Sequence, residues 1–181
     1  MRKTNRIYII GFFSLLIVAG HVYSQMEEKA NLFAKQLFRS LHSEDKHEFL
    51  KLIPDYEAYK RILVPFDSAN KINKRSEQIR IMTKEEYEQG INTEMVDYFN
   101  NYLADSRIIG FTWKKTELIE VTIKASSSGI PPTDLISLNG VLEVLFDRKT
   151  YLVKFEDAMW SKPDSSWYGI GLIEQPVLKK Q

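Results

Sequence analysis

The sequence predicts an α+β fold in which N-terminal helices pack against one face of a curved antiparallel sheet. The first half of the chain carries apolar residues at helical spacing, and the second half alternates apolar and polar residues with the period of a strand. Helices followed by a run of strands are typical of α+β domains. The length of 181 residues, with 27% charged and 44% hydrophobic residues, predicts one globular domain.

The N-terminus has the three-part pattern of a secretory signal peptide. Three basic residues come first, which are Arg2, Lys3 and Arg6. The apolar run that follows, Ile7–Gly20, has 14 residues and is shorter than the ~20 residues that cross a bilayer. We therefore expect a signal peptide over 1–24, cleaved after Ser24, and a single α+β domain over 25–181. Cleavage after Gly20 and an uncleaved membrane anchor are the alternatives.

Composition restricts where the protein works and what it binds. Removing the three basic residues of the signal from the 25 in the chain leaves 22 basic against 24 acidic residues, so no positive field attracts nucleic acid or anionic lipid. The absence of cysteine excludes disulfides, thiol catalysis, thiolate zinc sites and the lipid-bearing cysteine of a lipoprotein. We expect an exported protein, periplasmic or secreted, without stable membrane insertion after signal cleavage.

Three helices are expected in the first third of the domain. The first has an apolar stripe at i, i+3, i+4, i+7, i+8 and i+11, which consists of Ala30, Phe33, Ala34, Leu37, Phe38 and Leu41. Ser43 is suited to cap a second, short helix that ends before Pro54. Asp55 is suited to cap a third helix in the same way.

A long helix is expected after a less regular stretch over 64–82. Thr83 and Glu86 match a capping box, in which each side chain accepts a hydrogen bond from the other residue's backbone amide. The apolar stripe of the helix that follows consists of Tyr87, Ile91, Met95, Tyr98, Phe99 and Tyr102.

The second half is expected to form an antiparallel meander joined by short turns. Its first strand buries Ile119, Val121 and Ile123 on one face. The segment Val141–Phe146 is apolar on both faces, which is typical of a central strand. The remaining turns and strands are, in order, the turn 147–150, the strand 151–155, the turn 163–165 and the closing strand Trp167–Ile173.

This order of elements resembles the cystatin-like fold of the nuclear-transport-factor-2-like superfamily. The resemblance covers roughly residues 28–174, and it lies in the segments FAKQLFRSL and FLKLIP and the closing strand WYGIGL. The chain also resembles small exported bacterial proteins of unknown function that close with a turn and a Trp-Tyr strand. The superfamily fold implies a cone that holds a ligand, a catalytic acid–base pair or only packed side chains.

The sequence predicts neither a metal site nor nucleophilic catalysis. His42 and His47 lie five residues apart, whereas two imidazoles on one helical face need a spacing of four. There is no G-x-S-x-G motif and no phosphate-binding loop, so no cofactor is expected. Between Lys60 and Arg80 six basic residues outnumber two acidic ones. We interpret this excess as a solvated face, with binding of anionic glycans or headgroups as the alternative.

Asp157 is the candidate catalytic residue. It lies in phase with Tyr151, Val153 and Phe155, so it would point inward if the strand is regular. Burial would then raise the pKa of its carboxyl group. An exposed acid near a kink in the strand is the interpretation that we favour, because shifts of register are common.

Four aromatic residues are candidate ligand-binding residues, which are Trp113, Trp160, Trp167 and Tyr168. The segment WSKPDSSWYG is expected to form a hairpin. Because neighbouring residues of a strand face opposite sides, Trp167 and Tyr168 belong to different layers. Coplanar rings that face solvent would favour glycan binding, and burial of all three tryptophans would exclude it.

These observations favour a non-catalytic module that binds a ligand or another protein. The expected partner is a small molecule, a glycan or a protein. Two alternatives stay open. One is an enzyme of the same fold that uses an inward-facing carboxylate for proton transfer or hydrolysis, and the other is glycan binding through exposed aromatics.

Overall fold

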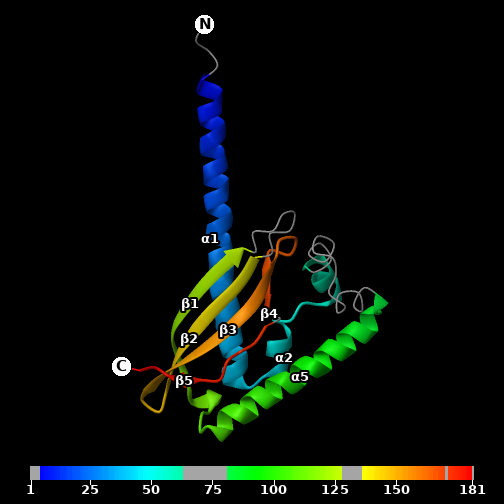
Figure 1. Ribbon diagram of the computed structural model, residues 1–181, viewed down its shortest axis with the longest axis vertical. Coiled ribbons are helices and arrows are strands. Elements are labelled where there is room, and N and C mark those ends of the chain that lie inside the picture. The colour runs from blue at the N-terminus through cyan, green and yellow to red at the C-terminus, as the bar shows by residue number, and fades with distance from the viewer. Residues whose placement is uncertain (1–4, 63–80, 128–135, 170, 181) are drawn as a thin grey trace.

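The computed structural model describes residues 5–62, 81–127, 136–169 and 171–180, with side chains from Ser24 onward except at residue 127. The architecture is α+β, as predicted, with helices beside an open antiparallel sheet of five strands. Helix α1 (Asn5–Ser43) is one continuous helix, and its N-terminal part extends beyond the strands (Figure 1). Over the described residues, no helix combines the length and the apolarity that a membrane span requires.

The apolar stripe predicted for α1 faces the core. Its buried members are Ala30, Phe33, Ala34, Leu37 and Leu41, and Phe38 is half-buried. This face binds the helix to the sheet, because each fully buried Leu or Phe side chain contributes roughly 1.5–3 kcal/mol relative to exposure.

A short helix, α2 (Lys46–Leu50), follows directly. Asp45 caps it by accepting hydrogen bonds from the backbone amides of His47 and Glu48. The prediction that Ser43 is the cap is wrong, because the Ser43 hydroxyl donates instead to the backbone oxygen of Arg39, at 2.8 Å, inside α1. The cap lies further along the chain because α1 continues through Ser43 itself.

The two later caps are confirmed. The Asp55 carboxylate accepts a hydrogen bond of 2.7 Å from the amide of Ala58 at the start of a helix over 56–62. Thr83 and Glu86 form both bonds of the capping box at the start of helix α5 (Lys84–Ile108). These local bonds define where each helix begins, because they satisfy backbone amides that have no partner within the helix.

The sheet has the order β1-β2-β3-β4, and β5 pairs with the beginning of β3. The strands are β1 (Glu117–Ser127), β2 (Ile136–Phe146), β3 (Lys149–Ser161), β4 (Ser166–Gly169) and β5 (Val177–Leu178). The predicted central strand is therefore confirmed in β2. The closing strand is shorter than predicted, because β4 ends at Gly169 and Ile173 makes only an isolated bridge to Phe155.

Two bulges shift the register of the sheet. The first inserts Ile119 between Leu118 and Glu120, which leaves Ile119 exposed on β1. The prediction that Ile119 is buried is therefore wrong, and Leu118 packs against the core instead. In the second bulge Asp157 adopts a φ of 59°, a left-handed conformation that aspartate tolerates better than most residues.

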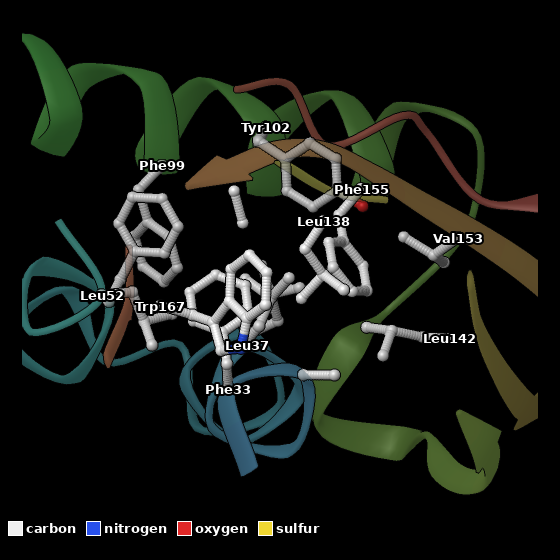
Figure 2. Packing of buried hydrophobic residues seen from close by; sticks show 14 of the residues in the cluster. Phe33, Leu37, Leu52, Phe99, Tyr102, Leu138, Leu142, Val153, Phe155 and Trp167 are labelled. Carbon is white, nitrogen blue, oxygen red and sulfur yellow. The ribbon is translucent and has the colours of Figure 1, made fainter. Parts of the chain in front are cut away.

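One hydrophobic core joins the helices and the inner face of the sheet. Figure 2 shows Phe33 and Leu37 of α1, Phe99 and Tyr102 of α5, and the strand residue Phe155 meeting in it. The strands also contribute Leu138, Leu142, Val144, Val153, Ala158 and Trp167. The helices thus cover one face of the sheet, as the fold prediction requires.

Hydrogen bonds fasten the chain after β4 to α5. The Tyr98 hydroxyl accepts a bond of 2.7 Å from the amide of Ile173, and the Tyr102 hydroxyl donates one of 3.1 Å to the backbone oxygen of Glu174. Ser106, one turn further along α5, donates to the Gln175 side chain at 2.9 Å. The spacing of four residues places all three side chains on one face of the helix.

Candidate functional site

A pocket of about 280 Å³ lies between α1 and the end of the sheet where β1 stops and β2 begins. Most of its lining is apolar, and this part consists of Met26, Ala30, Ile123, Ile136, Leu138 and Trp167. Three further lining residues, Glu27, Ala125 and Ser126, are exposed and so lie at its mouth. The pocket therefore combines an apolar interior with a polar rim, the pattern of small-molecule sites.

Trp167 forms the rigid wall of this pocket. It is 5% exposed, and its indole nitrogen donates a hydrogen bond of 3.1 Å to the backbone oxygen of Met26. Its partner across the β3–β4 hairpin is Trp160, with ring centroids 5.2 Å apart. Because both ends of the indole are held, the ring has a fixed orientation when a ligand arrives.

Small side chains provide the empty space opposite Trp167. Ala30 on α1 and Ala125 on β1 both line the pocket, and neither fills it. The polar groups at the mouth are the Glu27 carboxylate and the Ser126 hydroxyl, whose oxygen lies 3.0 Å from that of Ser137. A ligand with an apolar body and one hydrogen-bonding group fits these surroundings.

The centre of the core offers no comparable space. A cavity between α1 and β3, beside Phe33, Leu37 and Phe155, has a volume of about 30 Å³. That is roughly the share of one water molecule in the liquid. A larger hollow of about 720 Å³ lies beside the β2–β3 turn, but most of its lining consists of exposed Arg and Lys side chains, and one of these, Lys179, pairs with Glu143. The pocket beside Trp167 is therefore the candidate site.

The structure separates the four aromatic candidates. Trp160 and Trp167 are adjacent, but their rings are inclined by 56° and are not coplanar. Trp113 is 1% exposed in the core, where it packs on Phe111. Tyr168 follows Trp167 along β4 and so points to the opposite face, half-buried. Of the four, only Trp167 lines the pocket.

Asp157 does not point inward. The bulge moves its carboxylate to an exposed position, and its backbone amide donates a hydrogen bond of 2.9 Å to the side-chain oxygen of Asn139. The structure therefore shows Asp157 as an exposed acid at a kink of the strand. The inward orientation failed because the bulge adds one residue and reverses the alternation that placed Asp157 in phase with Phe155.

The histidines form no metal site within the described residues. His42 is half-buried and stacks on Phe38, with ring centroids 5.5 Å apart, whereas His47 is exposed. The basic stretch from Lys60 to Arg80 falls mainly on 63–80, outside the described residues. Of its described members, Lys60 lies 3.9 Å from the centre of the Tyr56 ring and Arg61 forms an ion pair of 2.7 Å with Asp164.

Burial controls the titration of three tyrosines. It raises the pKa of Tyr98 and, much more strongly, the pKa of Tyr102, whose hydroxyl lies between α5 and the chain after β4. Burial also raises the pKa of Tyr168, with a smaller contribution from the negative charge of Asp164. All three hydroxyl groups stay protonated at neutral pH, and those of Tyr98 and Tyr102 act as hydrogen-bond partners that position backbone.

Comparison with known proteins found no match among family models, curated proteins or solved structures. The assignment of the candidate site therefore rests on the geometry of the pocket alone. Sequence reasoning identified one of its walls, Trp167, as a candidate ligand-binding residue. It missed Met26, Ala30 and Ala125, because a pocket built from four separate segments leaves no local pattern.

Proposed function

We propose that this protein binds a small apolar molecule, without catalysis, in the pocket beside Trp167. The observation that carries the proposal is a space of about 280 Å³ with apolar walls, while the centre of the core is filled. An apolar cavity of roughly 150 Å³ is enough for benzene, and typical ligand pockets begin near 300 Å³. The pocket has room for a ligand with up to about three aromatic rings or for a short acyl chain.

The chemistry of the lining supports binding over catalysis. Among the described residues that line the pocket, Glu27 alone carries an ionisable side chain, and it is exposed. Proton transfer needs an acid or base in contact with the substrate, with a pKa adjusted by burial or by a neighbouring charge. An exposed carboxylate at the mouth instead favours ligands with a hydrogen-bond donor at one end.

We also propose that the protein is exported and cleaved after Ser24. Ser24 and Gln25 are exposed, whereas Met26 is buried and accepts the hydrogen bond from Trp167. Cleavage there would preserve this first contact of α1 with the sheet and leave the new N-terminus beside the pocket. The intact mass of the exported protein tests the site of cleavage. A mass that begins at Gln25 is expected, and a full-length chain held in the membrane fraction would contradict the proposal.

The cystatin-like cone belongs to the same proposal. A long helix against the inner face of an antiparallel meander supports it, and in such a cone the pocket would be the open mouth. The resemblance implies that such a space can hold a ligand. Fold alone does not select the function, so the pocket itself has to be tested.

A fluorescence titration with N-phenyl-1-naphthylamine tests the binding proposal. With about 17 non-hydrogen atoms at ~0.3 kcal/mol each, this neutral probe should bind with a Kd on the order of 0.1 mM. Ala125→Phe should weaken binding at least about tenfold, because the added ring enters the pocket from an exposed position and leaves the core intact.

Ala104→Phe supplies the matched control, because Ala104 is an exposed alanine of α5 away from the pocket. This variant should bind the probe as the wild type does. Equal affinities for the wild type and Ala125→Phe would refute the proposed site. Equal thermal stability of the two variants would show that the loss of binding is not a loss of fold.

A further inference from the structure

The outer edge of β1 has no partner among the described segments of the chain. β1 lies at one end of the strand order, next to β2, and Figure 1 shows its other side free of any labelled strand. A strand edge with unpaired amides and carbonyls is a template for a further strand. Natural proteins usually block such an edge with charged side chains, proline or a bulge.

The charged residues of this edge are arranged symmetrically, and protection against strand pairing does not require such an arrangement. Glu120 and Lys124 are both exposed, and they lie on the same face of β1, two residues either side of Thr122. Opposite charges placed symmetrically about one residue are complementary to themselves when the strand is turned by 180°. The bulge at Ile119 ends the regular strand just before Glu120 and so limits which registers are available.

We infer that two copies of this chain pair through their β1 edges, antiparallel, with Thr122 facing Thr122 of the second copy. In this register each Glu120 faces Lys124 of the other copy, and each Val121 faces Ile123. The inner pair is half-buried and apolar, so it extends the core side of the sheet. The interface is two-fold symmetric, as is usual for dimers of identical chains.

Neighbouring registers lack this complementarity. A two-fold axis at Ile123 places Lys124 opposite Thr122 and leaves Glu120 opposite Ser126. An axis at Glu120 or at Lys124 places like charges against each other, which is destabilising. The register centred on Thr122 pairs both charges at once and joins two five-stranded sheets into one continuous sheet.

Charge reversal and sedimentation velocity test the inference on the whole protein, from about 10 µM to about 1 mM, because dimer stability depends on protomer concentration. The wild type should form dimers that weaken at high salt. Either single reversal, Glu120→Lys or Lys124→Glu, should raise the dissociation constant at least about tenfold, because both symmetric pairs become repulsive.

An equal mixture of the two single variants is the decisive sample. One variant then carries two positive charges on its edge and the other two negative charges, so the mixed pair is complementary at both positions. The mixture should therefore associate at least as well as the wild type, and so should the double reversal of both residues in one chain. Asp97→Lys, at an exposed position of α5, controls for the change of net charge.

A wild type that stays monomeric over this range would overturn the inference. So would single variants that dimerise as the wild type does, or a mixture that stays monomeric when the wild type is dimeric. The pocket is tested separately, because Glu120 and Lys124 do not line it.

Discussion

The indole nitrogen of Trp167 donates a hydrogen bond of 3.1 Å to the backbone oxygen of Met26, and this bond joins the β3–β4 hairpin to α1. Trp167→Phe removes the bond and part of the buried ring. We expect a loss of about 1–3 kcal/mol in the free energy of unfolding, measured by urea denaturation.

Trp160→Phe is the matched comparison. Trp160 is half-buried, and its indole makes no hydrogen bond within the part of the chain that the structure describes. Its substitution should cost clearly less than that of Trp167. Equal losses for the two variants would mean that the bond to Met26 contributes nothing measurable.

The boundary of the folded domain leads to a second prediction. A chain that starts at Gln25 should have the thermal stability of the complete chain, because the described side chains before Met26 are exposed. A chain that starts at Asn31 lacks the buried residues Met26 and Ala30, and it should unfold at a lower temperature. Circular dichroism melting curves check both, and equal melting temperatures for all three chains would contradict the role of Met26.

The Phe155 ring leaves no room for a side chain at position 140, so this position requires glycine. A Cβ at this position would lie 2.3 Å from the Phe155 ring, so Gly140→Ala should destabilise the protein by about 1–3 kcal/mol. Gly90 on α5 has open space around it, and Gly90→Ala should stabilise the helix by about 0.5–1 kcal/mol. Chemical denaturation distinguishes the two, and a neutral Gly140→Ala would refute the close approach of the Phe155 ring to Gly140.

The buried tyrosines predict a loss of stability at alkaline pH. Burial raises the pKa of Tyr98 and of Tyr102 in the folded protein above the value near 10 of the unfolded chain. Their contribution is therefore fully present below about pH 10 and is lost as the pH rises from there toward the folded pKa. Tyr102→Phe should flatten the decline in melting temperature between about pH 9 and 11. Parallel profiles for the variant and the wild type would contradict this assignment.

Local patterns predicted most of the helices, strands and turns, because the residues that determine where each one begins or ends lie close together in the sequence. The capping box of Thr83 and Glu86 and the turn through Asp147 are of this kind, and both are present. The cap of α2 was placed two residues too early, at Ser43 instead of Asp45. Here two residues two positions apart could each serve as the cap, and the length of α1 decided between them.

The register of the strands was less accessible to sequence reasoning. The bulges at Ile119 and Asp157 depend on which residues of β2 they face, and alternation along one strand does not contain that information. The first bulge moved Ile119 from the predicted inner face to the solvent, and the second gives Asp157 an exposed position that a regular strand would not. The same limit explains why the candidate pocket was missed, since Ala30 and Ala125 are unremarkable in sequence and become significant only opposite Trp167.

The central claim is that an apolar ligand occupies the space beside Trp167. Methyl NMR during a titration with N-phenyl-1-naphthylamine tests it most directly, because the pocket is lined by the methyl groups of Met26, Ile123, Ile136 and Leu138. We predict saturable shifts concentrated in these methyl groups, with little change at Leu103 and Val144 in the core. Shifts spread over the exposed Ile108, Ile109 and Leu172, with none in the pocket, would contradict the account.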